Sequence, residues 1–304
     1  MKEKNIEPAE EKRVIDNMEP AEEKYVTNNT EPAEEKYVIN NTESVKEKHV
    51  SDNKEKKHRK RKAWKKFLLI LALILGIFAV GCLIYVNQYY HSMVTLDEAR
   101  AKKQQVCVTQ EKGYIEILPA DSKPETAFIF YPGGKVEYTA YLPMLETLAS
   151  RDVACYLMKM PCNLAVFDMD AAEKIRENDA CAYERWYVGG HSLGGAMAAS
   201  YVAKEAEDYD GLVLLGAYAT EDLTGTDLKV LSLYGSEDGV LNWEKYIENK
   251  GHLPEDTQEV ELKGGNHAYY GNYGEQKGDG TAKITREEQQ ALVVEAMMSF
   301  VNNE

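Results

Sequence analysis

Positive charge is scarce in this chain of 304 residues, which has 36 lysines and arginines against 51 aspartates and glutamates and a formal net charge of −15. The deficit is largest after residue 66, where 19 basic side chains face 36 acidic ones. An acidic surface of this kind repels polyanions. The composition therefore disfavours nucleic acid as a partner.

Cysteine is also rare, with only 5 in the chain. Cys107, Cys155, Cys162 and Cys181 follow the apolar segment described next, in the part expected outside the cell, where disulfides can persist. A domain large enough to have its own core equally accommodates buried free thiols. The sequence leaves the pairing of these four residues open.

One long apolar run is present at residues 67–86, FLLILALILGIFAVGCLIYV, and its length suits a helix that crosses the bilayer's hydrocarbon core. Eight basic residues in 56–66 precede it, and basic residues near a span are retained in the cytoplasm. We predict a single-pass cell-membrane protein with a cytoplasmic N-terminus and an extracellular C-terminal part. The long preceding tail disfavours a cleaved signal peptide, and the run continues past Cys82, which disfavours lipid attachment there.

The N-terminal segment is repetitive. Residues 7–54 repeat with a period of 12 as EPAEEKRVIDNM, EPAEEKYVTNNT, EPAEEKYVINNT and ESVKEKHVSDNK. The units are poor in apolar residues, and three contain proline, so we expect residues 1–55 to be a disordered cytoplasmic tail. We favour a solvated spacer over a docking motif centred on Lys-Tyr-Val. The basic juxtamembrane segment at 56–66 would attract anionic lipid headgroups.

After a predicted stalk at 87–105, short β-rich runs alternate with amphipathic helical stretches over residues 106–304. This pattern predicts one α/β domain with a mostly parallel sheet covered by helices. The expected strands are 113–118, 126–131, 153–159, 185–189, 211–216, 228–234 and 257–262. The expected helices lie near 136–150, 169–178, 193–206, 241–249 and 285–302.

A G-x-S-x-G motif, Gly190-His191-Ser192-Leu193-Gly194, lies between an expected strand and an Ala-rich helix. The pattern alone is weak, but its context is that of a nucleophilic serine, which needs a cramped strand-to-helix turn with small residues around it. We therefore predict that Ser192 is a catalytic nucleophile.

A nucleophilic serine needs a histidine that takes its proton and a carboxylate that orients the histidine. The strand at 228–234 ends in Gly-Ser-Glu-Asp-Gly, which places Asp238 at the functional edge of the sheet, with Glu237 as the alternative. Among the 6 histidines, His267 follows the last expected strand, whereas His252 comes too soon after Asp238. The predicted triad is Ser192, Asp238 and His267.

The tetrahedral intermediate of acyl transfer carries an oxyanion, which needs preset hydrogen-bond donors. The Leu193 amide follows the nucleophile and supplies one. The loop after the strand at 126–131 reads Pro-Gly-Gly-Lys. We predict that the Gly134 amide is the second donor, with Lys135 as the alternative.

Five segments, YPGGKV, PCNLAVF, GGHSLGGAMAA, YGSEDG and GGNHAYYGNYGEQKGDG, together resemble bacterial α/β-hydrolases of the small, lidless, dienelactone-hydrolase-like kind. The resemblance covers residues 106–304. It implies an eight-stranded, mostly parallel sheet with helices on both faces, and acyl transfer without a metal or cofactor. Dienelactone hydrolases use cysteine where this chain has Ser192, so their substrate is not carried over.

The short connection between the strands at 211–216 and 228–234 leaves no room for a large lid, so an open site is expected. Small esters, acylated envelope polymers and bilayer lipids all suit an open extracellular site. Lys135, Tyr269 and Tyr270 are expected to contact substrate, although the tyrosines could equally pack flat on the surface. The expected activity is that of a membrane-anchored carboxylesterase. An acyltransferase and a non-catalytic tethered binding module are the alternatives, and the oligomeric state is open.

Overall fold

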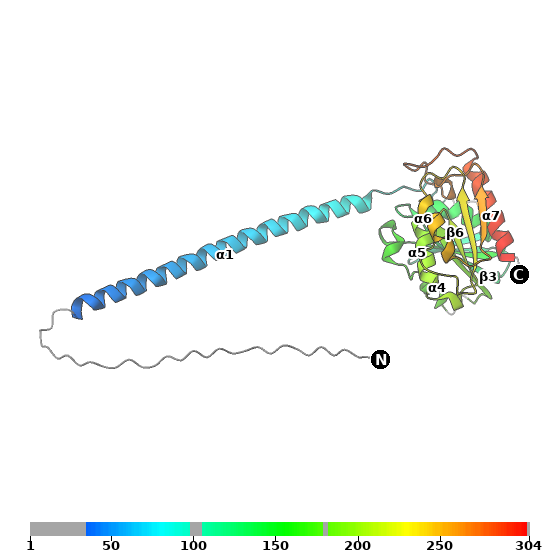
Figure 1. The fold of residues 1–304 in the computed structure, drawn as a ribbon. Helices are drawn as coiled ribbons and strands as arrows, with labels where there is room; N and C mark the ends of the chain where they lie inside the picture. The colour runs from blue at the N-terminus through cyan, green and yellow to red at the C-terminus, as the bar shows by residue number, and fades with distance from the viewer. Residues whose placement is uncertain (1–34, 98–104, 179–181, 303–304) are drawn as a thin grey trace, which may run out of the picture. The chain divides into compact units, whose positions relative to one another are not determined.

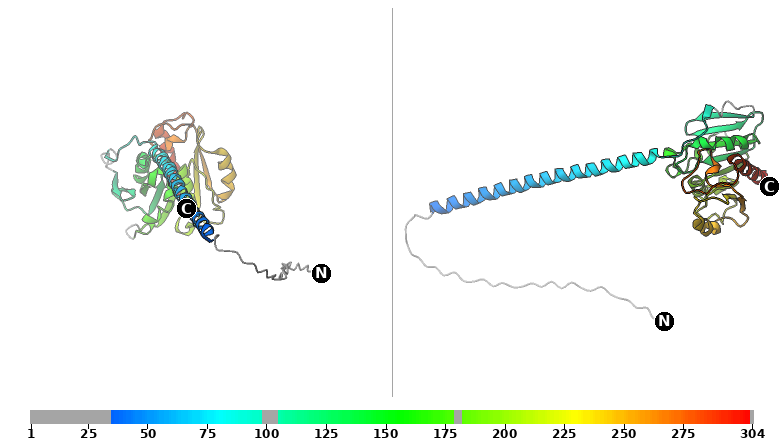
Figure 2. Two further views of the ribbon diagram at one scale, coloured as in Figure 1. Left: turned by 90° about the vertical axis from the view of Figure 1, so that its left-hand side faces the viewer. Right: turned by 90° about the horizontal axis from the view of Figure 1, so that it is seen from above.

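The computed structural model describes residues 35–97, 105–178 and 182–302, and for residues 35–47 it describes the backbone alone. The first element is a single long helix, α1 (Glu35–Asn87), which Figures 1 and 2 show as uninterrupted. Its C-terminal part is long and apolar enough to cross a membrane, and side chains such as Leu69 and Phe78 are exposed. Such an apolar helix is compatible with a membrane anchor.

The helix begins earlier than expected. Residues 35–55 were predicted to be disordered, and the structure shows them as helical. The reason lies in the decay of the repeat. The last proline of the tail is Pro32, and the fourth unit has Ser44 in the equivalent place. Without proline, a segment rich in lysine and glutamate extends an existing helix and needs no new nucleus. Residues 1–34 of the predicted tail lie outside the described residues.

Eight strands form one sheet in the order β1-β2-β4-β3-β5-β6-β7-β8. Strands β1 and β2 pair antiparallel, as do β2 and β4, whereas the other neighbours are parallel. This is the mostly parallel, eight-stranded sheet that was predicted. Their bounds are β1 Val106–Glu111, β2 Tyr114–Pro119, β3 Thr126–Tyr131, β4 Val153–Met158, β5 Arg185–His191, β6 Gly211–Leu215, β7 Lys229–Gly235 and β8 Gln258–Leu262.

Seven of these strands match the expected runs, whereas β1 was not assigned from the sequence. Only Val106 and Val108 of β1 are buried, because the strand lies at the edge of the sheet. A half-polar edge strand has too weak an apolar pattern to stand out, whereas β3 and β4, buried along their whole length, read as continuous apolar runs.

Helices cover both faces of the sheet (Figure 1). Residues of α3 and α7 pack with Phe128 and Phe130 in one core, and residues of α5 pack with Ala127 and Ile129 in the other. The alternation along β3 separates the two cores. The α-helices of this domain are α3 Leu142–Ala149, α4 Glu173–Arg176, α5 Leu193–Val202, α6 Trp243–Glu248 and α7 Arg286–Asn302. The 3-10 helices are η1 Tyr138–Tyr141, η2 Pro161–Asn163, η3 Ala165–Phe167, η4 Ala206–Asp208, η5 Asn249–His252 and η6 Ala268–Tyr270.

Residues 90–93, predicted to belong to a stalk, are attached to the domain. Tyr90 pairs with Val136 in a parallel β-bridge, in which the Tyr90 amide donates to the Lys135 carbonyl at 2.7 Å and the Glu137 amide donates to the Tyr90 carbonyl at 2.9 Å. The segment has backbone groups that need partners, and the loop after β3 supplies them. Residues 98–104 of the predicted stalk lie outside the described ranges.

Cys82, Cys107, Cys155 and Cys162 are free thiols among the described residues. Cys155 is buried in the centre of the sheet, and burial raises the pKa of its thiol far above the ordinary value. Cys181, which the sequence left as a further pairing candidate, lies outside the described residues.

Candidate active site

Ser192 occupies a strained turn between β5 and α5. Its φ of 53° and ψ of −123° are values that a residue with a side chain rarely adopts. The Ser192 amide donates to the Leu215 carbonyl of the neighbouring β6 at 2.9 Å, which holds the turn against the sheet. This is the geometry of a nucleophile elbow, which presents the serine at the end of the strand.

Two glycines make the elbow possible. A Cβ atom on Gly190 would lie 2.4 Å from the Tyr131 carbonyl oxygen, and one on Gly194 would lie 2.3 Å from the carbonyl oxygens of Tyr131 and Pro132. No side chain fits at such distances. The glycines of the motif therefore allow α5 to start directly against the loop after β3.

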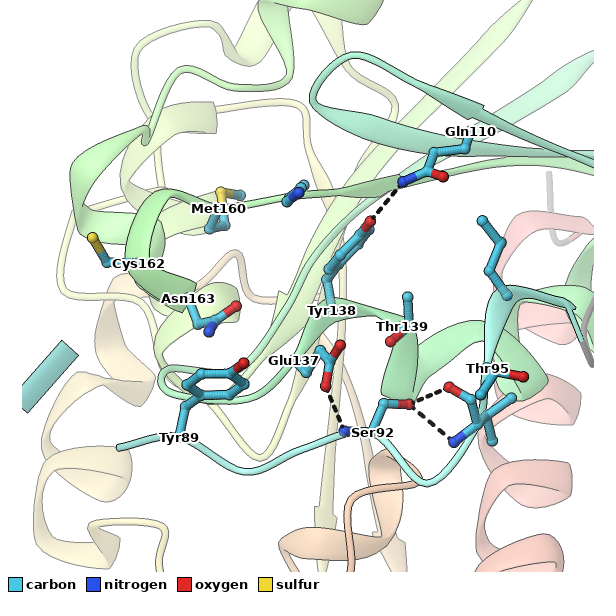
Figure 3. A pocket seen from close by; sticks show the side chains of 13 residues that line it. Tyr89, Ser92, Thr95, Gln110, Glu137, Tyr138, Thr139, Met160, Cys162 and Asn163 are labelled. Carbon is cyan, nitrogen blue, oxygen red and sulfur yellow. Dashed lines mark hydrogen bonds between the residues drawn. The ribbon is translucent and has the colours of Figure 1, made fainter. Parts of the chain in front are cut away.

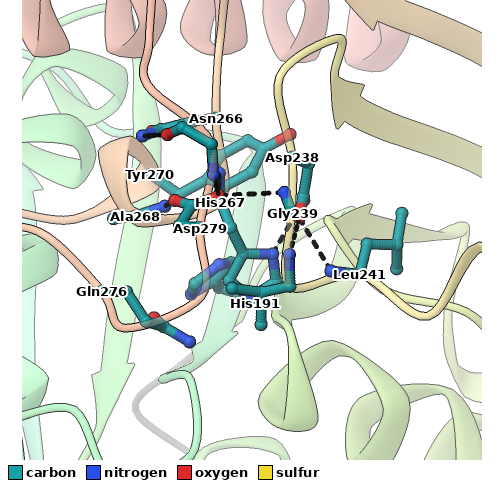
Figure 4. A network of polar contacts seen from close by, with 12 residues as sticks. His191, Asp238, Gly239, Leu241, Asn266, His267, Ala268, Tyr270, Gln276 and Asp279 are labelled. Carbon is teal, nitrogen blue, oxygen red and sulfur yellow. Dashed lines mark hydrogen bonds and ion pairs between the residues drawn. The ribbon is translucent and has the colours of Figure 1, made fainter.

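Asp238 and His267 form a buried pair, although they come from different loops after β7 and β8. The His267 Nδ1 atom lies 2.7 Å from Asp238 Oδ2, and both side chains are almost fully shielded from solvent (Figure 4). The other oxygen, Oδ1, accepts the amides of Val240 at 2.9 Å and Leu241 at 2.7 Å. Asp238 is therefore fixed as an acceptor and holds the proton of His267 on Nδ1.

The remaining ring nitrogen of His267 is available. Nε2 is buried and has no hydrogen-bond partner among the described residues. His267 and Ser192 line the same cavity of about 230 Å³, together with Leu193, Ala196, Gly216, Ala217, Tyr218, Val240, Leu241 and Asn242. The fold thus brings the three residues of the predicted triad to one edge of the sheet.

The backbone amides of the loop after β3 differ in whether they have an acceptor. Gly133 donates to the Tyr141 hydroxyl at 3.0 Å, Lys135 to the Asn163 carbonyl at 2.7 Å, and Val136 to the Gly133 carbonyl at 3.2 Å. Gly134 donates to no acceptor in the described part of the chain. Its α-carbon faces Leu193, whose Cβ would lie 3.1 Å from a Cβ on Gly134. The two predicted donors are neighbours, and the alternative, the Lys135 amide, is occupied.

The three expected substrate-contacting residues are absent from the lining of this cavity. Lys135 turns towards the Tyr85 carbonyl and lies over the Tyr85 ring. The Tyr269 ring packs under the Arg286 guanidinium, whose central carbon lies 4.5 Å from the ring centre of Tyr269. Tyr270 is fully buried, and its hydroxyl donates to the Leu233 carbonyl.

The alternative acid, Glu237, is also directed away from the histidine. Its carboxylate pairs with Lys283 at 2.6 Å and accepts the Ser236 hydroxyl, and these contacts lower the pKa of Glu237. Of the two carboxylates in this loop, only Asp238 meets His267.

His191, the second residue of the elbow motif, is fully buried beside the pair, with its ring centre 4.5 Å from that of His267. The Tyr141 hydroxyl accepts the Gly133 amide, and its own proton has no other acceptor than His191 Nδ1 among the described residues, so we assign it as the donor to that nitrogen at 2.8 Å. Burial lowers the pKa of His191 well below its ordinary value, and the neighbouring His267 adds to this effect. His191 is thus a neutral acceptor that links the elbow to the loop after β3.

Asp279 is the residue whose role the sequence did not reveal. Its Oδ1 accepts the amides of Gly239 at 3.1 Å and His267 at 3.2 Å, and its Oδ2 accepts the Ala268 amide at 2.8 Å (Figure 4). One carboxylate therefore fastens the Asp238 loop to the His267 loop. The only signal in the sequence was its place in the Gly-rich segment after the histidine.

The sheet, the helices on both faces and the elbow define an α/β hydrolase. A family model described as "Alpha/beta hydrolase family" matches residues 127–291, more than half of the chain, and the chain belongs to this family. The protein is therefore a hydrolase by family.

Two solved structures are similar at 14% sequence identity. A predicted CIB-like hydrolase from Thermoplasma acidophilum gives a TM-score of 0.47, with 64% of this chain and 99% of that chain covered. The protein TT1662 from Thermus thermophilus gives a TM-score of 0.49, with 66% and 100% covered. No curated protein matches the sequence.

Replacing Asp279 by alanine should separate the two loops. We expect kcat/KM for hydrolysis to fall about tenfold to a hundredfold, because a small misplacement of His267 relative to Ser192 is costly. The free energy of unfolding should fall by about 1–3 kcal/mol, because the Gly239, His267 and Ala268 amides lose their acceptor. Steady-state kinetics and denaturant unfolding measure the two effects. Asp256→Ala, in an exposed loop, is the control, and equal behaviour of the two variants would contradict the role of Asp279.

Burial of His191 predicts acid sensitivity. Its folded pKa is lowered, so below about pH 6.5 the unfolded chain binds a proton that the folded chain resists. The contribution of neutral His191 to the free energy of unfolding is complete above that pH. It is lost as the pH falls below it, by up to about 1.4 kcal/mol per pH unit. Denaturant unfolding between pH 7 and pH 5 measures the slope. His191→Gln, which keeps an acceptor for Tyr141, should give a shallower slope, and identical slopes would count against this assignment.

Proposed function

We propose that the chain is a membrane-anchored serine hydrolase that cleaves a carboxylic ester through an acyl-enzyme, with Ser192, Asp238 and His267 as its triad. The observation that carries the proposal is the buried hydrogen bond between Asp238 and His267, which leaves His267 Nε2 free in the cavity that Ser192 lines. A histidine held in this tautomer is prepared to accept a proton from a serine hydroxyl.

In the proposed reaction, His267 Nε2 removes the proton of Ser192 Oγ as the oxygen attacks the ester carbonyl. The carbonyl π-electrons move to its oxygen, and the amides of Gly134 and Leu193 donate to the oxyanion. The intermediate collapses with loss of the alcohol, which takes the proton from His267. Water, deprotonated by the same nitrogen, then attacks the acyl-serine carbonyl, and the acyl–Oγ bond breaks as His267 returns the proton to Ser192 Oγ and the acid leaves. Asp238 stabilises the imidazolium in both halves.

The cavity favours a short acyl group. Its volume of about 230 Å³ is smaller than that of most ligand sites, and Leu193, Ala217, Val240 and Leu241 make its wall largely apolar. The connection between β6 and β7, residues 216–228, is too short for a helical lid, so the alcohol part of the substrate can extend into solvent. A small-molecule ester and an acylated envelope polymer both fit this arrangement.

The anchor is the apolar part of α1, at residues 67–86. Its exposed side chains need an apolar surrounding, and the basic residues at 56–66 favour a cytoplasmic N-terminus. The hydrolase domain would then act outside the cell, at the surface of the membrane.

Covalent labelling tests the nucleophile directly. The detergent-solubilised full-length chain should react with a fluorophosphonate, and Ser192→Ala and His267→Ala should abolish the reaction because the attacking oxygen or its base is lost. Ser200→Ala, on the same helix α5, is the matched control and should label fully. A folded wild-type protein that stays unlabelled would overturn the proposal in favour of a binding module. If acyl groups pass to an added alcohol faster than to water, the enzyme is an acyltransferase.

Protease treatment of intact cells tests the topology. The domain at 106–304 should be digested from outside, while an epitope tag on the N-terminal tail should be protected until the cells are permeabilised. Digestion of the tag with a protected domain would show the opposite orientation. Replacing the basic residues of 56–66 by glutamine should weaken or invert the orientation, because these residues carry the charge asymmetry.

A further inference from the structure

The segment that follows α1 has more contacts with the active-site loops than a tether needs. We call residues 90–93 the exit strap and residues 132–137 the oxyanion loop. The Tyr90 amide donates to the Lys135 carbonyl, and the Tyr90 carbonyl accepts the Glu137 amide. The Ser92 amide donates to Glu137 Oε2 at 2.9 Å, at the wall of a cavity of about 610 Å³ (Figure 3). The strap therefore binds the C-terminal half of the oxyanion loop through three hydrogen bonds.

The same strap also contacts the loop that carries His267. The Met93 amide donates to the Asn272 carbonyl at 2.7 Å, and the Lys277 amide donates to the Tyr90 hydroxyl at 3.2 Å. The Tyr90 ring packs against the buried Tyr273 ring, with centres 5.6 Å apart. The strap thus joins the two loops that would supply the second oxyanion donor and the general base.

The oxyanion loop needs such support because its conformation is strained. Lys135 has a φ of 62°, which is unfavourable for a residue with a side chain. The Asn163 carbonyl accepts the Lys135 amide, and the Tyr90 amide donates to the Lys135 carbonyl, so the peptide groups before and after the Lys135 α-carbon are both held. The Gly134 amide, one residue earlier, has no acceptor among the described residues. Losing the Tyr90 contact would free the Lys135–Val136 peptide to rotate and would let the strained Lys135 relax, which would shift the Gly134 amide that precedes it.

We propose that the exit strap is a positioning element of the active site, in which Tyr90 holds the Gly134 amide in the orientation that binds the oxyanion. The inference rests on the proposed serine-hydrolase function and deepens it. Residues 90–93 are then part of the structure that positions the active site, and the functional unit begins before Val106.

The test uses the full-length chain in detergent and a short-chain p-nitrophenyl ester. Tyr90→Pro removes the amide that donates to Lys135. We expect kcat to fall about tenfold to a hundredfold with little change in KM, because an oxyanion donor acts mainly in the transition state. Hydrogen exchange in a peptide that covers residues 132–137 should become faster, which reports loop order without reference to activity. Ser92→Pro removes one contact to the oxyanion loop, the Glu137 contact, together with the two local contacts of the Ser92 hydroxyl to Val94, and should show a smaller change of the same kind.

Two variants provide the controls. Tyr89→Pro introduces proline one position earlier, where the amide has no acceptor among the described residues. This variant should retain wild-type kinetics and wild-type hydrogen exchange in residues 132–137. Tyr90→Phe keeps the backbone pairing and the ring contact with Tyr273, and should restore most of the activity. Tryptophan fluorescence confirms that each variant is folded.

The outcomes separate this inference from the proposed function. If wild type is labelled by a fluorophosphonate and Tyr90→Pro has wild-type kcat, the strap has no positioning role, even if exchange is faster. Unchanged exchange in folded Tyr90→Pro, or an equal loss in Tyr89→Pro, would also overturn the inference. If wild type itself is neither labelled nor active, the proposed function fails, and the positioning role fails with it.

Discussion

The hydrogen bond between Asp238 and His267 is the interaction around which the functional edge of this domain is organised. It joins two loops that follow neighbouring parallel strands, β7 and β8, and it is buried, so both groups need complete hydrogen bonding. The amides of Val240 and Leu241 satisfy the carboxylate, and Asp279 fixes the histidine loop from outside. A buried pair whose carboxylate and facing ring nitrogen are satisfied in this way orders both loops.

The serine elbow depends on the opposite kind of contribution, a locally unfavourable conformation held by its surroundings. Ser192 cannot relax because its amide is bound to β6, and because Gly190 and Gly194 pack directly on the backbone after β3. His191 strengthens the same junction through Tyr141, whose hydroxyl also holds Gly133. The elbow and the oxyanion loop are therefore one packed unit, and strain at Ser192 is balanced by contacts that lie outside the motif.

The sequence suggested that the apolar helix and the hydrolase domain are separate modules joined by a stalk. Here the first residues after α1 pair with the oxyanion loop and contact the histidine loop, so the linker shares the hydrogen bonds of the site. In this arrangement Tyr90, just after α1, contacts Lys135, which is the residue next to the proposed oxyanion donor Gly134. Under the proposed function, this arrangement gives a physical reason why the hydrolase domain would remain attached to the helix that precedes it.

The sequence by itself determined the fold class, the parallel strands at the centre of the sheet and the apolar segment at 67–86, and it was enough to propose Ser192, Asp238 and His267 as a site, because these depend on local apolar patterns and on motifs at strand ends. It could not determine the edge strand β1 or the helix over 35–55, whose local signals are weak. Only the tertiary structure decided that Tyr270 belongs to the core, that Asp279 joins two loops and that Tyr90 supports the oxyanion loop. Such roles arise from contacts between segments distant in the chain, and no local pattern records them.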